Sequence, residues 1–254
     1  MELDCFMKTI IDILKSLYFW TFFSVITCVV FLSILVHKFI YVLLGKDRFD
    51  LASHNWTCRW GKIILLLTPG WKVKIEGFDN IPIESNQKLV IVANHESMTD
   101  IWILCYLQIQ FRWLAKAELF KIPIIGQAMH LAGYIPVVRG NKKSHQEAMD
   151  ASAEWIKKGI PMLFFPEGTR SKTSELRPFK MGAFKLARDT QASILPVVLK
   201  GAGHLLPKGS PVPKSATVQV HILPVVPPPE PESDLQGYAD NVREMIQTNR
   251  DAME

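Results

Sequence analysis

Apolar residues gather near the start of the chain. Residues 16–36 form a run of 21 residues without a charge, and apolar residues resume at 39–44 before Gly45. A hydrocarbon core about 30 Å thick is spanned by about 20 apolar helical residues, so we expect one helix of membrane-spanning length that ends near Gly45. A cleaved signal peptide is the alternative, but its apolar region is typically about 7–15 residues long. The pattern leaves open whether the helix crosses the bilayer or folds back within one leaflet.

A second helix is predicted at 52–68, where Pro69 and Gly70 end it. Helical spacing places five apolar residues on one side of it, namely Trp56, Trp60, Ile63, Ile64 and Leu67. Two interpretations fit this face: an amphipathic helix lying in the membrane interface, or an ordinary helix facing a protein core. Lysine and arginine are more frequent after the first helix than before it, which predicts that the rest of the chain lies on the cytoplasmic side of a membrane.

From residue 71 on, short strand-like runs alternate with helical segments. The strand-like runs lie at 89–93, 134–138, 162–165, 194–199 and 217–223, and the helical patterns at 101–107, 144–158 and 183–188. This alternation predicts an α/β fold with a largely parallel sheet. A proline-rich connector at 225–234 precedes a last amphipathic helix. We therefore divide the chain into N-terminal membrane-anchoring helices at 1–71, an α/β domain at 72–228, and the connector with its C-terminal helix at 229–254.

The charge is distributed unevenly. The chain carries 29 Lys and Arg against 24 Asp and Glu, a formal net charge of +5. Residues 72–228 hold 20 basic and 12 acidic residues, while residues 229–254 hold two and seven. A basic domain favours an acidic partner, and because an apolar segment precedes it we expect anionic membrane lipids rather than nucleic acid. The four cysteines form no C-x-x-C pair and the histidines show no metal-ligand spacing, so no metal site is predicted.

The first candidate for chemistry is the heptapeptide NHESMTD at 94–100, which follows the predicted strand 89–93 and opens a helix. Ligand sites of open α/β sheets collect at the carboxyl ends of strands. His95 can act as a general base near neutral pH, and Asp100 can reach back to orient the imidazole and stabilise its charged form. The alternatives are a loop histidine with ordinary hydrogen bonds and a capping box in which Ser97 is the N-cap.

The second candidate is FPEGTRS at 165–171, again directly after a predicted strand. Gly168 lets the backbone approach a ligand closely, Thr169 offers hydrogen-bond donors, and the planar fork of Arg170 matches phosphate oxygens. Lys180, in the following PFKMG, adds a second cation. A plain Pro/Gly turn with a solvated arginine is the alternative.

Two further cations are candidates for the site. Arg139 lies beside Gly140 at the end of the run at 134–138, which is a plausible anion site. Lys116 can serve as a phosphate cation, as an oxyanion stabiliser, or simply as a solvated surface lysine. The sequence holds no G-x-S-x-G, G-x-G-x-x-G or P-loop pattern. A His–Asp pair without a serine nucleophile favours a reaction in which the substrate's own hydroxyl attacks.

Four motifs, NHESMTD, GYIPVVRG, FPEGTRS with PFKMGAF, and ILPVVL, occur in the order and rough spacing of the 1-acylglycerol-3-phosphate acyltransferase family. The chain resembles this family, also called lysophosphatidic acid acyltransferases or PlsC, over 77–224. The resemblance implies a membrane-bound transferase of phospholipid biosynthesis on a cytosol-facing membrane. It would move a fatty acyl group from acyl-CoA or acyl-carrier protein to lysophosphatidic acid, giving phosphatidic acid, without a metal or other cofactor.

The resemblance also assigns roles to single residues. It implies that His95 is the general base and Asp100 its partner, and Lys116 is similar to a lysine placed near that histidine. The substrate-binding set that it implies is Asn94, Arg139, Glu167, Gly168, Thr169, Arg170 and Lys180. Pro136 and Val137 depart from the family pattern, which leaves the acceptor less certain than the reaction. The alternatives are an acyltransferase for glycerol-3-phosphate or another lysophospholipid, and a non-catalytic lipid-binding membrane protein.

Overall fold

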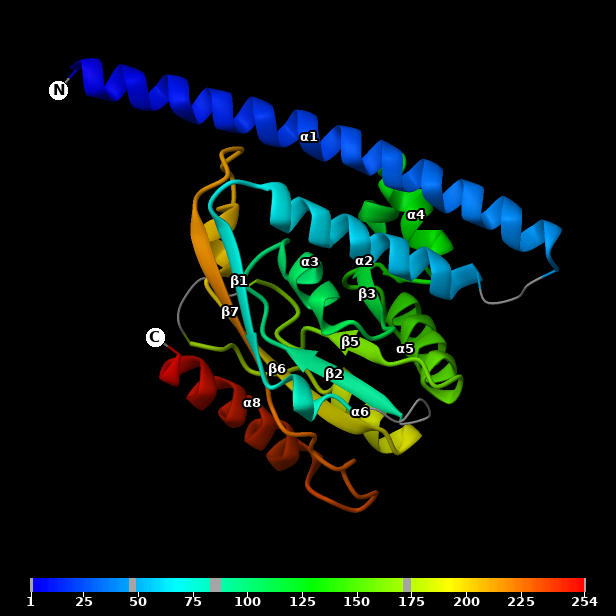
Figure 1. Cartoon of the computed structure of the whole chain (residues 1–254). Helices are drawn as coiled ribbons and strands as arrows, with labels where there is room; N and C mark the ends of the chain where they lie inside the picture. Colours follow the sequence, from blue (N-terminus) through cyan, green and yellow to red (C-terminus); the bar gives the residue numbers. More distant parts are fainter. Residues whose placement is uncertain (1, 46–48, 83–87, 171–174, 254) are drawn as a thin grey trace.

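A seven-stranded sheet forms the centre of the computed structural model, which describes residues 2–45, 49–82, 88–170 and 175–253 (Figure 1). The strand order is β1-β7-β6-β2-β5-β3-β4, and only the β6–β7 pair is antiparallel among the described strands. The prediction of an α/β fold with a largely parallel sheet is therefore confirmed. The strands are β1 Trp71–Glu76, β2 Leu89–Ala93, β3 Arg112–Lys116, β4 Ile135–Val137, β5 Met162–Phe164, β6 Ser193–Lys200 and β7 Ala216–Ile222.

Helices cover both faces of this sheet. One face is covered by α2 and α3, with α1 outside α2, and the other by α5, α6 and α8. Strand β2 shows how the sequence serves both layers, because Ile91 packs on the first side while Val90 and Val92 pack on the second. The helices are α1 Glu2–Leu43, α2 Phe49–Leu67, α3 Asp100–Leu104, α4 Ile125–Leu131, α5 Lys142–Lys157, α6 Gly182–Thr190, α7 Ala202–Leu205 and α8 Leu235–Ala252, with short 3-10 turns at Phe78–Asn80, Cys105–Leu107 and Ala117–Lys121.

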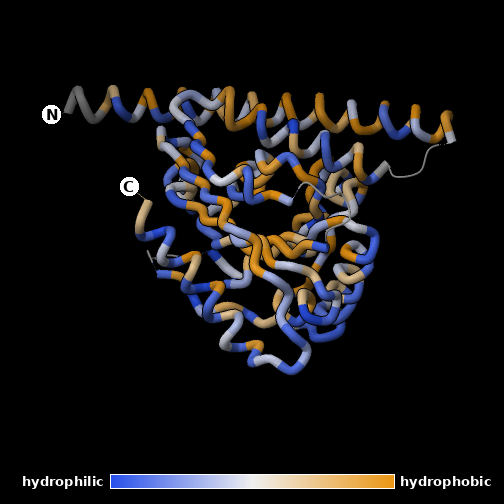
Figure 2. Tube along the Cα trace, turned by 60° about the horizontal axis from the view of Figure 1, so that its bottom comes forward, coloured by the Kyte–Doolittle hydropathy of each residue, from blue (hydrophilic) through white to orange (hydrophobic). Residues whose placement is uncertain are grey.

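Helix α1 lies along one side of the molecule and extends beyond it at the N-terminal end (Figure 1). Its 42 residues correspond to a rod about 63 Å long at about 1.5 Å per residue. Figure 2 shows apolar residues along much of its length, and a few of them, such as Phe19 and Ile34, are buried against the domain while Leu32 and Phe39 are 62% and 64% exposed. Among the described residues, this is the helix whose length and composition fit a membrane span.

Helix α2 is packed within the protein on two sides. Its Ile64 and Leu65 are buried in the first core, and the Trp60 Nε1 donates a hydrogen bond of 2.9 Å to Thr27 Oγ1 of α1. The Trp60 ring also lies edge-on to Trp102 of α3, with 5.5 Å between ring centroids. The part of the apolar face that holds Trp60 and Ile64 therefore contacts the protein core, while Leu67 is 54% exposed and its contact with a membrane interface stays a prediction.

The C-terminal helix α8 is part of the second core rather than an appendage. Its Leu235, Val242 and Ile246 are buried together with Phe184 of α6 and the outer side of β2. Asp234 caps its start by accepting a hydrogen bond of 3.0 Å from the Gln236 N–H. The last turn of α8 lies at the carboxyl end of β6, next to the loop that follows β2.

Candidate active site

The topology brings the candidate motifs to one edge of the sheet. Strands β2, β5, β3 and β4 are consecutive parallel neighbours, so their carboxyl ends meet at the same edge, where ligand sites of such sheets form. His95 follows β2, Gly168 follows β5, Lys116 ends β3 and Arg139 follows β4. Residues that lie far apart in the sequence are thus placed in one row.

His95 and Asp100 form a direct pair. The distance between His95 Nδ1 and Asp100 Oδ2 is 2.7 Å, and the Asp100 side chain is fully buried while that of His95 is 20% exposed. The His95 ring also stacks on Phe165, with 4.2 Å between ring centroids. A proton on Nδ1 that is donated to Asp100 leaves the lone pair of Nε2 for a substrate, which is the arrangement of a general base.

The same carboxylate oxygen holds the loop around the histidine. Asp100 Oδ2 accepts hydrogen bonds from the backbone N–H groups of Glu96 and Ser97, at 2.8 and 2.9 Å. Burial raises the pKa of Asp100 above its ordinary value, and the hydrogen bond and charge of His95, with these two N–H groups, act in the opposite direction. The contacts from His95, Glu96 and Ser97 therefore favour the charged form of Asp100, while its burial disfavours that form.

The capping alternative is realised only in part. Helix α3 begins at Asp100 with Thr99 as its N-cap, so the expectation that Ser97 is the N-cap is wrong. Ser97 Oγ accepts a hydrogen bond from the Thr99 N–H at 3.3 Å, because the chain makes a turn before the helix starts. The bond from the Ser97 N–H to Asp100 remains, and it coexists with the bond from His95.

Two predicted substrate-binding residues are buried and bind the backbone around the site. Asn94 is 1% exposed and makes two hydrogen bonds to the backbone of Leu199, at 2.8 and 2.7 Å. Glu167 is 4% exposed, and its two carboxylate oxygens accept bonds from the N–H groups of His95 and Arg177, at 2.9 and 3.2 Å. Their direct contact with a substrate stays a prediction, while the geometry shows that they hold the loop after β2.

The environment of Glu167 mixes opposing influences on its charge. Burial raises the pKa of this carboxyl, while the N–H groups of His95 and Arg177 and the charges of His95 and Arg250 lower it. The carboxylate thereby joins the loop of His95 to the loop that follows β5, at the point where the cations described next converge.

Three candidate phosphate-binding residues meet at Gly168. The Arg139 Nη2 donates a hydrogen bond of 2.9 Å to the Gly168 carbonyl oxygen, and Lys180 is held nearby by the bond from its N–H to the Pro166 carbonyl at 2.9 Å. Gly168 has a φ of +70°, and a Cβ at this position would overlap the Lys180 side chain. The positive φ therefore favours glycine here, and a side chain at this position would displace the flexible end of Lys180.

The other predicted residues lie around this cluster. Thr169 is half-buried and Arg170 is exposed, and Ser171 lies outside the described residues. Lys116 is exposed at the end of β3, in register with Val137 of β4. Neighbouring strands lie about 4.8 Å apart, so the end of β3 is about 10 Å from the end of β2, with β5 between them. The structure places Lys116 on the correct edge, and its role in the reaction stays a prediction.

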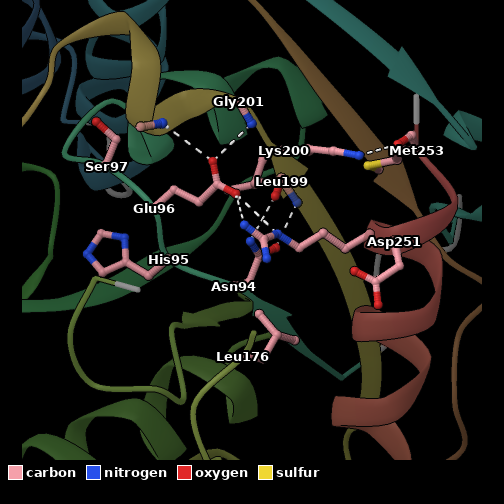
Figure 3. Close-up of polar contacts among 12 residues, drawn as sticks. Asn94, His95, Glu96, Ser97, Leu176, Leu199, Lys200, Gly201, Asp251 and Met253 are labelled. Carbon is pink, nitrogen blue, oxygen red and sulfur yellow. Dashed lines mark hydrogen bonds and ion pairs between the residues drawn. The ribbon is translucent and has the colours of Figure 1, made fainter. Parts of the chain in front are cut away.

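One acidic residue of the first motif was missed by sequence reasoning. Glu96 Oε1 lies 2.7 Å from Arg250 Nη2 and 3.2 Å from Nε, and Oε2 accepts bonds from the N–H groups of Gly201 and Gly203 at 3.0 and 3.4 Å. Figure 3 shows Glu96 directed toward Gly201, while the His95 ring points away from this network. No local pattern signals this contact, because Glu96 and Arg250 are 154 positions apart.

Comparison with known proteins gives consistent results. Residues 72–200 match the sequence model of the family described as Acyltransferase. A chloroplastic 1-acyl-sn-glycerol-3-phosphate acyltransferase of Brassica napus is 36% identical over 186 residues, which are 73% of this chain and 53% of that protein. The enzyme of the same name from Saccharomyces cerevisiae is 32% identical over 216 residues, covering 80% and 67% of the two chains.

The structural comparison covers nearly the whole chain. The crystal structure of the 1-acyl-sn-glycerophosphate acyltransferase PlsC from Thermotoga maritima aligns with a TM-score of 0.75 and 25% identity, over 96% of each chain. The chain spans about half the length of the chloroplastic relatives it matches, 53% and 50%. The family match extends over the four strand ends that carry the site, and the chain therefore belongs to the acyltransferase family.

Proposed function

We propose that this protein transfers a fatty acyl group from a thioester to the free hydroxyl of lysophosphatidic acid, giving phosphatidic acid. The observation that carries the proposal is the His95–Asp100 pair at a strand end, beside the Arg139, Gly168 and Lys180 cluster. The first group can activate a hydroxyl and the second can hold a phosphate. The names of the relatives describe the same acceptor.

The reaction begins when His95 Nε2 removes the proton of the acceptor hydroxyl, which attacks the thioester carbonyl. Asp100 holds the proton on Nδ1 and stabilises the imidazolium that forms. A backbone N–H or Lys116 stabilises the oxyanion. When the tetrahedral intermediate collapses, the C–S bond breaks, the imidazolium returns its proton to the leaving thiolate, and the ester remains on the acceptor.

The acceptor is held by cations rather than by the base. Arg139 and Lys180 converge on Gly168, and the exposed Arg170 follows two residues later in the same loop. Guanidinium groups match phosphate oxygens in geometry as well as in charge. This division lets the phosphate bind tightly while the hydroxyl stays free to react at His95.

We extend the proposal to the membrane and to the donor. The exposed apolar residues of α1 would seat the protein in membrane lipids, with the α/β domain on the cytoplasmic side, and the acyl chain of the acceptor would come from that membrane. Acyl-CoA and acyl-carrier protein both carry negative charge, so both suit the basic excess of residues 72–228.

The test is a matrix of donors and acceptors on the purified protein in lipid nanodiscs. Acyl-CoA and acyl-carrier protein are each combined with lysophosphatidic acid, glycerol-3-phosphate and lysophosphatidylcholine, and free thiol and labelled product are measured. We expect product with lysophosphatidic acid from at least one donor, and none from His95→Ala, since removing a general base typically costs about 10²–10⁴-fold. Transfer to another acceptor alone, or no transfer at all, would overturn the proposal.

A further inference from the structure

The C-terminal helix reaches the active-site loop through one ion pair. Glu96 directly follows the candidate general base His95, and its Oε1 lies 2.7 Å from the Nη2 of Arg250 in the last turn of α8. The two side chains are 9% and 11% exposed, so the pair is largely removed from water. The contact therefore links the loop after β2 to an element far away in the sequence.

The same carboxylate also binds backbone on a third element. Glu96 Oε2 accepts bonds from the N–H groups of Gly201 and Gly203, which lie at the end of β6 and the start of α7. Figure 3 shows Glu96 directed toward Gly201, and the Arg250 guanidinium binds the other carboxylate oxygen. Glu96 is thus the common partner of β6, α7 and α8, and its orientation fixes the backbone to which His95 belongs.

Helix α8 holds the second loop of the site as well. The Gln247 Oε1 accepts a hydrogen bond of 2.8 Å from the Leu176 N–H, and the next residue, Arg177, donates its N–H to Glu167. At the end of the helix, the Lys200 Nζ donates to the Met253 carbonyl oxygen (Figure 3). One turn of α8 therefore contacts the segment that precedes Lys180 as well as the loop of His95.

The energetics of buried ion pairs favour a positioning role for Arg250 over a stabilising one. Taking two charges out of water largely offsets their attraction, so a buried ion pair contributes little net stability, but removing one partner leaves an uncompensated charge. If Arg250 is lost, the anionic Glu96 gains by turning toward water, and the adjoining backbone of His95 moves with it. Small displacements of a reacting group of about 1 Å can cost about 10²-fold in rate.

We propose that Arg250 is a positioning residue for acyl transfer, which acts through Glu96 to keep His95 in place beside the phosphate-binding cluster. The proposal rests on the proposed function for its kinetic readout. Arg139 lies in the loop after β4 and Lys180 in the segment before α6, so displacement of the loop after β2 predicts a larger effect on turnover than on acceptor binding.

The kinetic test compares Arg250→Gln with wild type and with Arg250→Lys. We expect Arg250→Gln to lower kcat by about 10- to 100-fold, with the KM for lysophosphatidic acid changed less than about twofold because the phosphate site is intact. Arg250→Lys keeps a cation near Glu96 and restores most of the turnover. In the double variant Glu96→Gln, Arg250→Gln, the loss is no greater than in Glu96→Gln alone, because both residues act through one contact.

A matched control separates positioning from simple loosening of α8. Val242 lies on the same helix, is 1% exposed in the second core and contacts neither loop through a hydrogen bond in the described structure, so Val242→Ala weakens the docking of α8 without touching Glu96. We expect its Tm to fall at least as much as that of Arg250→Gln, while its kcat stays near the wild-type value. An equal loss of kcat in both variants at equal Tm would overturn the proposal.

Hydrogen exchange tests the same idea without turnover. Peptides that cover 94–100 and 200–206 are followed by mass spectrometry in wild type, Arg250→Gln and Val242→Ala. Faster exchange in both peptides for Arg250→Gln alone supports the positioning role, and unchanged exchange overturns it. If the wild type transferred no acyl group to any acceptor, the proposed function would fail, but this exchange result would still decide whether Arg250 holds the loop.

Discussion

The charge of Asp100 can be removed with little change to the loop that it holds. Asp100 Oδ2 receives three N–H donors, from His95, Glu96 and Ser97. In Asp100→Asn the amide oxygen takes this place and keeps all three bonds, since an amide nitrogen there would leave three buried donors unpaired. The amide nitrogen then takes the place of Oδ1, which is buried without a hydrogen-bond partner among the described residues, so its unpaired donors lower stability. The three bonds to the oxygen keep the loop and the imidazole in place while the negative charge opposite the imidazolium is removed.

The expected loss of rate in Asp100→Asn follows from the distance between the charges of His95 and Asp100. Two unit charges about 4 Å apart interact by about 4 kcal/mol at an effective dielectric constant of about 20. In the proposed mechanism His95 gains its charge as it takes the proton of the acceptor, so the loss falls on the barrier. A barrier higher by about 4 kcal/mol slows the step by about 10³-fold, at about 1.4 kcal/mol for each tenfold.

The assay is kcat at saturating donor and acceptor, with Tm by circular dichroism as the control for folding. Ser97→Ala serves as the matched variant, because it removes the Ser97 Oγ from the Thr99 N–H without altering the charge of the pair, and we expect a loss below about tenfold, of the size of one neutral hydrogen bond. If Asp100→Asn folds normally and loses less than about tenfold in kcat, Asp100 serves only to hold the loop, and the electrostatic reasoning is wrong.

Three further outcomes are expected at other positions. Gly168→Ala should raise the acceptor KM at least several-fold at similar kcat, because its Cβ displaces Lys180 and strains a positive φ, and steady-state kinetics will show this. Burial raises the folded-state pKa of Glu167 above its ordinary value of 4.5. The folded protein therefore holds this proton to a higher pH than the unfolded chain does, and it loses stability as the pH rises above 4.5. Between pH 4 and 7 the Tm of Glu167→Gln should accordingly rise relative to the Tm of wild type. The double variant Leu32→Lys, Val36→Lys places charges on the exposed face of α1, where burying each apolar side chain contributes about 1.5–3 kcal/mol, and vesicle flotation should show a loss of binding of at least about 10²-fold.

The parts of the fold that the sequence predicts are those with a regular pattern of apolar residues along their length. Strand β2 is buried on both sides and reads as an unbroken apolar run. Strands β1 and β3 were not predicted. In β1 the lysines at 72 and 74 face outward from an edge strand, and in β3 the fully buried Arg112 pairs with Asp50 of α2 at 2.7 Å. A buried arginine cannot be predicted from the local sequence, because its burial depends on a partner that is distant in the chain.

The same distinction holds for the site. The His95–Asp100 pair is separated by five residues, so a local turn brings the groups together and the spacing alone indicates it. The row formed by Lys116, Arg139 and Gly168 depends on strand order, which the alternation of elements restricts but does not specify. Contacts such as that of Glu96 with Arg250 depend on the packing of a last helix onto a completed sheet, and composition or periodicity holds no trace of them.

The pairing of Glu96 with Arg250 also sets an order of events during synthesis. A ribosome makes α1 first and reaches Arg250 about 200 residues later, an interval of about 10–40 s at about 5–20 residues per second. The loop of His95 is made before Arg250 and lacks this partner until the end of synthesis, whereas the apolar α1 is made earlier still. Under the proposed membrane association, α1 can therefore contact the bilayer before Arg250 completes the contacts of the His95 loop.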